Sequence, residues 1–178
     1  NAQRGHMVLF YHLELSPEDV SMRSALRLSK EPLEQHGLEV GATDRSFVMA
    51  VGDTIDSWPG EVTYVHCPGW TAEQICSDWR AQVARKRVDL VIIDYLGMIE
   101  CEYVKGGTAE TALARVVATI KTAAGKSGIP CILGHQVTKA DRTSRDGQKI
   151  TLTDYRGSGQ VAEKSTVCLG LWNGPQAD

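Results

Sequence analysis

The chain has 178 residues and a mass of 19.4 kDa, which suits one domain built around one hydrophobic core. Hydrophobic residues make up 42% of the sequence and charged residues 23%, so a disordered chain, a collagen-like repeat and a coiled coil are excluded. Lysine and arginine number 19 against 22 aspartates and glutamates, which gives a net charge of −3. Any contact with nucleic acid therefore has to come from local basic clusters.

The cysteines and the apolar runs indicate the compartment. The five cysteines are odd in number and include no Cys-x-x-Cys pair, which favours reduced thiols in a cytosol-like environment. No apolar run reaches the roughly 18–20 residues of a membrane span, and the polar N-terminal residues are not typical of a signal peptide. We therefore expect a soluble, cytoplasmic protein that makes no contact with a membrane.

The first predicted element is a strand at residues 7–13, where a continuous apolar run is typical of a strand buried on both faces of a parallel sheet. Ser16 and Pro17, followed by two acidic residues, indicate the start of a helix that we expect to continue to about Lys30. The sequence thus predicts a strand that leads directly into a helix.

The stretch from residue 31 to residue 60 has the least regular pattern. Apolar residues at helical spacing between Phe47 and Ile55 predict a helix, which the Trp-Pro-Gly run at 58–60 ends. The run at 61–66 predicts a strand, because apolar and polar residues alternate in it.

Thr71 and Gln74 form a capping box at the start of a further helix, whose stripe of Ile75, Trp79 and Val83 is expected to face the core. The remaining predicted elements are a strand at 88–94, a long helix that ends at Gly128, a strand at 129–135, a polar loop at 137–153 and a last strand at 167–172. Strands that alternate with helices predict an α/β fold with an open, mostly parallel sheet.

Three of the predicted strands end in side chains that suit chemistry. Glu14 follows the first strand, Asp94 ends the strand at 88–94, and Gln136 follows the strand at 129–135. Because ligands of open α/β sheets bind beyond the carboxyl ends of the strands, we expect two carboxylates and an amide at one edge. Charged residues also mark strand ends in proteins without a site there, so no single position decides between the two interpretations.

Asp94 follows four aliphatic residues, which is the Walker B pattern of nucleotide-hydrolysing proteins. In such a strand the apolar run is buried, and the carboxylate holds Mg²⁺ through its water shell beside the nucleotide phosphates. Aliphatic runs that end in aspartate occur in many α/β proteins, so the pattern gains its meaning from the residues around it.

Four blocks of the sequence together resemble DnaB-type replicative helicases. Residues 8–16 resemble the strand of that family that ends in Ser-Leu-Glu-Met-Ser, with His12 and Leu15 as substitutions. Residues 89–99 are similar to the family's Walker B strand, which continues as Asp-Tyr-Leu-Gln. Residues 128–136 are similar to the family's strand that ends in Ser-Gln, and residues 153–161 are similar to its Asp-Leu-Arg-Glu-Ser-Gly-x-Ile element. All four follow the family's order and spacing and leave residues 31–60 uncovered.

The resemblance implies a RecA-like ATPase core with a mostly parallel sheet flanked by helices. It implies ATP and Mg²⁺ as cofactors, assembly into a homo-hexameric ring, translocation on single-stranded DNA with duplex unwinding, and a primase or helicase loader as a further partner. Such a protein would lie in the bacterial cytoplasm, or in the host cytoplasm if a phage encodes it. All 178 residues would belong to one domain, incomplete at its N-terminus.

The resemblance also assigns roles to individual residues. Glu14 would be the general base that polarises the attacking water, Asp94 would hold the magnesium ion, and Gln136 would sense the γ-phosphate. The residues that would contact DNA are Lys139, Arg142 and Arg145 in the polar loop and Arg156, Gly157 and Gly159 in the last block. Gly157 stands where the family has glutamate, so its contact departs from the pattern. A solvated loop and an ordinary Gly-Ser-Gly turn before a strand are the alternative interpretations.

Two family features have no counterpart among these residues. A P-loop is expected before residue 1, and the Ala-Gly-Lys-Ser run at 124–127 does not replace it, because Ile120 stands where the first glycine of a P-loop belongs. The family's basic finger is expected beyond residue 178. Two alternatives therefore stay open, a RepA-like or other RecA-fold hexameric ATPase of a phage or plasmid, and a degenerate RecA-fold module that binds DNA or a partner without hydrolysis.

Overall fold

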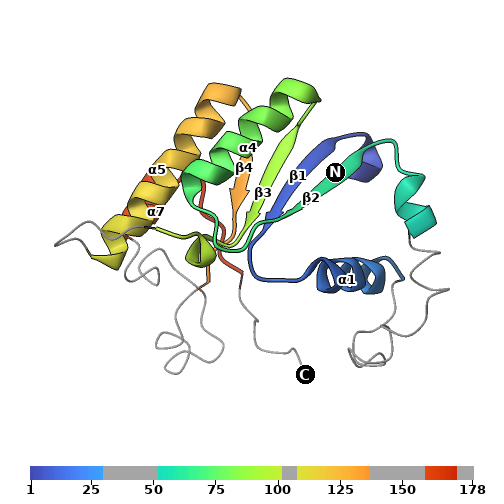
Figure 1. Ribbon diagram of the computed structural model, residues 1–178, viewed down its shortest axis with the longest axis horizontal. Coiled ribbons are helices and arrows are strands. Elements are labelled where there is room, and N and C mark those ends of the chain that lie inside the picture. The colour runs from blue at the N-terminus through green and yellow to red at the C-terminus, as the bar shows by residue number, and fades with distance from the viewer. Residues whose placement is uncertain (30–51, 102–107, 137–158, 172–178) are drawn as a thin grey trace.

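The computed structural model describes residues 1–29, 52–101, 108–136 and 159–171, and four parallel strands form its centre (Figure 1). The strands are β1 (Met7–His12), β2 (Glu61–His66), β3 (Leu90–Asp94) and β4 (Cys131–Leu133), in the spatial order β2-β1-β3-β4. β1 therefore pairs on both sides. The predicted open, parallel α/β sheet is confirmed.

Asp89 fixes where β1 starts relative to β3. The Met7 N–H donates to Asp89 Oδ2 at 2.8 Å, and the Asp89 N–H donates back to the Met7 carbonyl at 2.8 Å. The hydrogen bond from Met7, together with the nearby Arg87 guanidinium, lowers the pKa of Asp89, so its carboxylate stays ionised as an acceptor. From this start the register places His12 opposite Asp94 in β3 and opposite His66 in β2.

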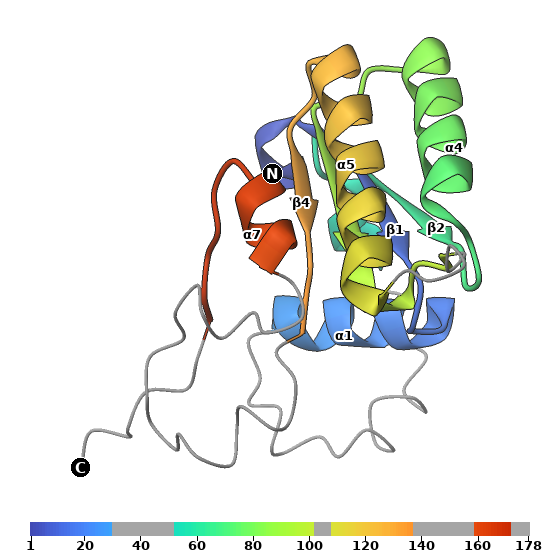
Figure 2. The ribbon, with the colours of Figure 1, turned by 90° about the vertical axis from the view of Figure 1, so that its left-hand side faces the viewer.

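Three helices cover one face of the sheet, and both ribbon views show α4 beside α5 there (Figures 1 and 2). They are α4 (Ala72–Arg85), α5 (Ala109–Ser127) and the short α7 (Gly159–Lys164), which packs against α5. α4 begins at the predicted capping box of Thr71 with Gln74, and α5 ends at Gly128, whose φ of 68° is the left-handed conformation that glycine adopts easily.

The remaining described helical segments are one longer helix and three short ones. α1 (Pro17–Ser29) follows β1 and lies on the side of the strands away from α4 and α5 (Figure 1). It begins as predicted, because Ser16 Oγ accepts the Asp19 N–H at 3.1 Å. Residues 52–56 form a short helix that agrees with the predicted helix before residue 58, and two short 3-10 helices cover Ala2–Arg4 and Leu96–Met98.

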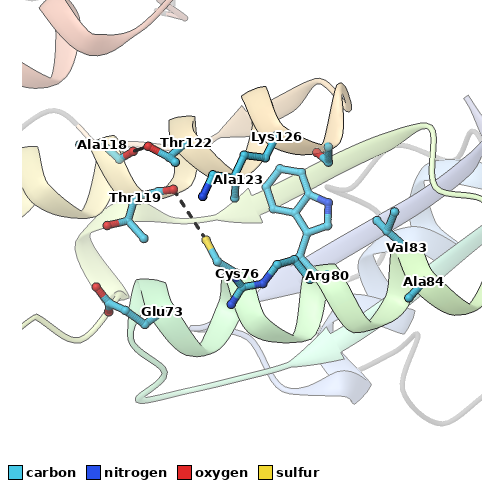
Figure 3. Close-up of a pocket in the computed structure, with 12 residues that line it drawn as sticks. Glu73, Cys76, Arg80, Val83, Ala84, Ala118, Thr119, Thr122, Ala123 and Lys126 are labelled. Atoms are coloured by element: carbon cyan, nitrogen blue, oxygen red, sulfur yellow. Dashed lines mark hydrogen bonds between the residues drawn. The ribbon is translucent and has the colours of Figure 1, made fainter.

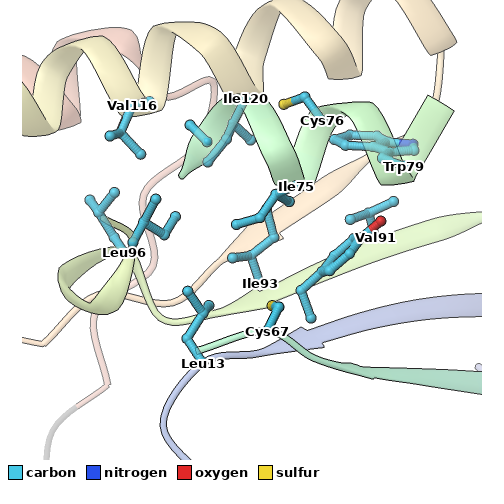
Figure 4. Packing of buried hydrophobic residues seen from close by; sticks show 14 of the residues in the cluster. Leu13, Cys67, Ile75, Cys76, Trp79, Val91, Ile93, Leu96, Val116 and Ile120 are labelled. Carbon is cyan, nitrogen blue, oxygen red and sulfur yellow. The ribbon is translucent and has the colours of Figure 1, made fainter. Parts of the chain in front are cut away.

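The core lies between the sheet and the pair α4 and α5 (Figure 4). Ile75 and Trp79 of α4 are buried against the strands as predicted, and Val83 of the same stripe is partly buried. Val116 and Ile120 of α5 are buried in the same core. The largest fully buried side chains include Trp79, Tyr11, Leu9, Leu13, Ile75, Ile93 and Leu96. Because the buried side chains come from both the strands and the helices, the hydrophobic effect holds the two layers together.

Tyr11 brings a polar group into this core. Its ring is fully buried, and its hydroxyl donates to Asp78 Oδ2 of α4 at 2.9 Å. Burial, with the hydrogen bond to Asp78 and the charge of that carboxylate, raises the pKa of Tyr11 far above its ordinary value. The phenol therefore stays protonated and ties β1 to α4.

The opposite face of the sheet carries an apolar row. Tyr64, Phe10, Ile92 and Ile132 are register partners on four successive strands, and the Phe10 and Tyr64 rings meet edge to face at 5.5 Å. Tyr64 is 45% and Ile132 56% exposed, so described residues cover this face only in part. This face is thus more open than the face beneath α4 and α5.

The last predicted strand is wrong. Residues 165–171 form neither strand nor helix, and Val167, Leu169 and Leu171 are 73–90% exposed. Alternating apolar residues suit a strand, but a strand also requires a hydrogen-bonded neighbour, and this segment has none among the described residues. β4 is shorter than the predicted 129–135, since it has three residues, and Pro130 before it lacks an N–H.

Other predictions fall outside the described residues, among them the whole of the polar loop at 137–153 and most of the stretch from 31 to 60. All five cysteines are free thiols, as predicted. Among the described helices none is both long and apolar enough to cross a membrane.

We predict that Tyr11→Phe lowers the free energy of unfolding by about 1.5–3 kcal/mol, because it leaves the partly buried Asp78 carboxylate without the hydroxyl that donates to it. Urea unfolding followed by circular dichroism measures the loss. Tyr64→Phe is the matched control, since Tyr64 is half-exposed, and its effect should stay within about 0.5 kcal/mol. Equal effects of the two variants would contradict this role of Tyr11.

Candidate functional site

The carboxyl ends of β1, β3 and β4 meet at one edge. The Leu13 N–H donates to the Asp94 carbonyl at 3.0 Å, which continues the pairing of β1 with β3 one residue beyond the strand. On the other side of β3, the Gly134 N–H donates to the Ile93 carbonyl at 2.9 Å. These bonds bring together the segments that hold Glu14, Asp94 and Gln136.

Glu14 is exposed and lies in a turn that is fixed at both ends. Leu13 before it is buried in the core, and its N–H is bonded to the Asp94 carbonyl. Ser16 after it caps α1 and also donates its hydroxyl to Asp19 Oδ2 at 2.8 Å. The carboxylate of Glu14 is therefore presented to solvent from a backbone with little freedom.

Asp94 is exposed at the end of β3, and Gly134 of the neighbouring segment lies against it. A Cβ at position 134 would come within 3.3 Å of both Asp94 Oδ1 and Tyr95 Cβ. The Leu96 N–H donates to the Gly134 carbonyl at 2.9 Å, and the peptide bond between Asp94 and Tyr95 is cis. Because Gly134 has no Cβ, the backbone after β4 approaches the carboxylate without the crowding that a side chain at this position would cause.

Gln136 is exposed, two residues beyond Gly134. The side chain before it, His135, is half-buried, and burial lowers its pKa. His135 is therefore a neutral imidazole at pH 7, and the amide of Gln136 is the polar group that this segment offers to solvent at the edge.

The residues predicted to contact DNA are mostly not placed. Lys139, Arg142, Arg145, Arg156 and Gly157 lie outside the described residues. Gly159 is the first residue of α7, so it begins a helix and is not part of a turn before a strand.

The thiols of Cys67 and Cys131 do not suit catalysis or metal binding. Burial raises the pKa of Cys67 to about 11, and its Sγ donates to the His12 carbonyl at 3.8 Å. Burial likewise raises the pKa of Cys131 to about 12, so both thiols are protonated at pH 7. Within the described ranges, no three His, Cys, Asp or Glu side chains gather into a metal site.

Asp94 nevertheless suits one kind of cation. Its hard carboxylate oxygens are exposed where a ligand of an open α/β sheet binds, and the bare backbone of Gly134 borders them. Mg²⁺ usually keeps several waters and takes only one or two carboxylates, the rest of its shell coming from substrate phosphates. A lone Asp94 fits that pattern.

A cavity of about 640 Å³ lies elsewhere, between α4 and α5 (Figure 3). Residues of these two helices line it, with Cys76 donating its thiol to the Thr119 carbonyl at 4.0 Å, and Arg80 and Lys126 among the lining side chains. None of Glu14, Asp94 and Gln136 lines this cavity. The chemistry predicted for the strand ends is therefore not located there.

Residues 1–172 match the model of the family described as the DnaB-like helicase C terminal domain. The chain belongs to this family. The resemblance seen in the four sequence blocks is confirmed, and the family is one of helicase domains. No curated protein sequence matches it.

Two solved structures share the fold of this DnaB-like domain. One is described as an ATPase domain, and the other as a DnaB-like replicative helicase with its interactions with primase. Each has a TM-score of 0.76 and 17% sequence identity over 92% of this chain, which spans 58% and 39% of their respective lengths. The four-stranded parallel sheet with its flanking helices is thus the RecA-like fold of DnaB-like ATPase domains, as predicted.

Sequence reasoning missed the part that Gly134 plays beside Asp94. A signal was present, because an isolated glycine at the end of an apolar strand often marks a close approach of another chain segment. The glycine lies in the block at 128–136, whose resemblance to the family strand points to its last residue, Gln136, and gives Gly134 no role of its own.

We predict that Gly134→Ala lowers the free energy of unfolding by about 1–3 kcal/mol, because the added methyl presses on Asp94 and Tyr95. Gly125→Ala is the matched control. Gly125 lies in α5 with nothing within 4 Å of an added Cβ, so this variant should gain up to about 1 kcal/mol. Chemical unfolding of both variants measures the difference, and a Gly134→Ala protein as stable as the control would contradict the close approach.

Proposed function

We propose that this domain is the ATP-hydrolysing motor core of a replicative helicase, which translocates on single-stranded DNA and unwinds duplexes as a homo-hexameric ring. The observation that carries the proposal is the bond from the Leu13 N–H to the Asp94 carbonyl, because it holds Glu14 and Asp94 at one edge of the sheet. Membership of the DnaB-like family supplies the reaction class. All 178 residues belong to this core, which needs a phosphate-binding P-loop N-terminal to β1.

Glu14 acts as the general base in this proposal. In-line attack on the γ-phosphate requires an acceptor within hydrogen-bond reach of the attacking water. The exposure of the Glu14 carboxylate supports this role, as does the backbone held on both sides by Leu13 and Ser16. Glu100, the alternative among the acids that follow β3, is also exposed, and its N–H donates to the Trp70 carbonyl at 3.0 Å.

Asp94 and Gln136 are the residues that interact with the nucleotide in this proposal. Asp94 would hold Mg²⁺ through its waters, and the ion, when bound, neutralises charge on the phosphate oxygens. In this proposal Gln136 donates its amide N–H to the γ-phosphate. The residues predicted to form the polar loop follow it directly, so the presence of that phosphate is coupled to the conformation of that segment. ATP and Mg²⁺ are therefore the proposed cofactors.

The proposed DNA contacts come from the predicted polar loop at 137–153 and from the sequence block at 153–161. The predicted loop supplies Lys139, Arg142 and Arg145, and Arg156 of the block adds a charge-assisted phosphate contact beside Gly157 and Gly159. Repetition of these cations around a ring concentrates positive charge in a channel, which lets a protein of net charge −3 bind a polyanion. A primase or a helicase loader is the further proposed partner of the ring.

The function is tested by ATP hydrolysis with and without single-stranded DNA, using the full-length protein and its Glu14→Gln variant. We predict DNA-stimulated hydrolysis by the wild type, and turnover reduced on the order of 10²-fold or more in the variant, because an amide keeps the shape but cannot accept the proton. Nucleotide binding, measured by fluorescence titration, should be retained.

Glu18→Gln is the matched control, since Glu18 is also an exposed acid and lies in the first turn of α1. Its turnover should equal that of the wild type. If Glu14→Gln hydrolysed ATP at the wild-type rate while Glu100→Gln or Glu102→Gln did not, the base would be an acid that follows β3. A wild-type protein without any hydrolysis would instead favour the non-hydrolysing module.

Neutralising Arg142, Arg145 and Arg156 together should weaken single-stranded DNA binding to a similar extent for all sequences. Each lost phosphate contact removes about 0.7 from the slope of the log–log plot of affinity against salt concentration. Fluorescence anisotropy at several salt concentrations measures both effects, and basal ATP hydrolysis should largely survive.

Three exposed arginines on α4 and α5 supply the control, namely Arg80, Arg85 and Arg115. Their joint neutralisation removes the same charge, so it tests whether net charge alone explains the loss. Equal slopes for the two triple variants, or an effect on one DNA sequence only, would refute the assignment of the channel cations.

A further inference from the structure

His12 makes a hydrogen bond that spans the turn of Glu14. Its side chain is only 2% exposed, and Nδ1 lies 2.9 Å from the carbonyl oxygen of Leu15. A carbonyl oxygen only accepts hydrogen bonds, so Nδ1 carries the hydrogen and donates it. The imidazole of the last β1 residue thus holds the backbone one residue beyond Glu14.

This bond closes a small ring around the proposed base. The backbone runs from His12 through Leu13 and Glu14 to Leu15, and the imidazole returns from Leu15 to His12. Within the ring, the Leu13 N–H is bonded to the Asp94 carbonyl, and the His12 carbonyl accepts the Cys67 N–H at 3.0 Å. Glu14 is therefore an exposed side chain in a ring whose backbone is fixed on both sides of it.

Neighbouring rings fix the plane of the His12 imidazole. The His66 ring stacks on it with centroids 4.9 Å apart and an interplanar angle of 17°. The Tyr64 ring meets it edge-on at 6.3 Å, and Phe10 lies 6.2 Å away on the same strand. With rotation restricted on these sides, Nδ1 stays directed at the Leu15 carbonyl.

We propose that His12 is a positioning residue for hydrolysis, which sets the turn of Glu14 through the hydrogen bond from Nδ1 to Leu15. This inference rests on the proposed role of Glu14 as the base. His12 stands where the related helicase element has serine, so the bond is a feature of this chain and not a transfer from the family. Its loss should affect the geometry of catalysis and leave nucleotide binding unchanged.

Two substitutions of similar polarity separate positioning from simple packing. In His12→Asn the side-chain nitrogen can occupy the place of Nδ1 and donate to Leu15, whereas in His12→Gln it reaches the place of Nε2 and cannot make the same bond. We expect His12→Gln to lower kcat of the full-length protein at least about tenfold with KM for ATP unchanged, and His12→Asn to restore most of the turnover.

His66→Gln is a matched control, because it removes one ring that restricts the His12 imidazole but leaves the nitrogen that donates to the Leu15 carbonyl. Its effect on kcat should be smaller than that of His12→Gln. Equal kcat values for His12→Asn and His12→Gln would overturn the proposal, as would a change in KM alone. Thermal unfolding of each variant establishes that the compared proteins are folded.

A spectroscopic measurement tests the bond without any substitution. At a pH of about 8.5, well above the ordinary histidine pKa, ¹⁵N shifts of histidine-labelled protein distinguish the two neutral tautomers. We expect the hydrogen of His12 on Nδ1, and a hydrogen on Nε2 would overturn the proposal even if the variants failed to fold. A wild-type protein that hydrolyses no ATP but shows the Nδ1–H form would refute the proposed function and leave the hydrogen bond established.

Discussion

The central position of β1 is the constraint on which the rest of the structure depends. β1 pairs in parallel with β2 on one side and with β3 on the other, and its register with β3 starts from the reciprocal bonds between Met7 and Asp89. A shift by one residue would turn every side chain of β1 to the other face. Tyr11 would then lose Asp78, and His12 would enter the apolar core beneath α4. The packing of the core and the arrangement of the candidate site therefore both require the observed register of β1.

Much of the fold could be predicted because short sequence patterns determine where many of its helices and strands begin and end. Three examples are the apolar run at β3, the Thr71 capping box and Gly128 at the end of α5. Each acts within a few residues, so each can be recognised without knowledge of the rest of the chain. The run at 167–171 is equally apolar, and its predicted strand is wrong. Whether this segment forms a strand depends on a neighbouring strand to pair with. The apolar pattern of the segment does not show whether such a partner exists elsewhere in the sequence.

The candidate site likewise has features that could be predicted from the sequence and features that could not. The polar residues at strand ends could be predicted to share an edge, because parallel strands deliver their carboxyl ends to one side of a sheet. The bond from His12 to Leu15 and the approach of Gly134 to Asp94 could not, since both depend on side-chain direction and on register between segments. At position 12 the sequence shows only a substitution within a familiar element, and its physical meaning needs the three-dimensional position of the Leu15 carbonyl.

The open face of the sheet carries two adjacent rows of residues, one apolar and one at the candidate site. The first row is the apolar set Tyr64, Phe10, Ile92 and Ile132, and the second, two residues further along each chain, is His66, His12, Asp94 and Gly134. Parallel sheets are normally covered on both faces, so the apolar row, with Tyr64 and Ile132 about half-exposed, has surface left that a covering segment can bury. The second row changes from stacked imidazoles to a carboxylate and then to bare backbone. Among these four residues only Asp94 is acidic, and because Gly134 carries no side chain, the Asp94 carboxylate is less obstructed on the side of β4 than on the side of the buried His12 imidazole.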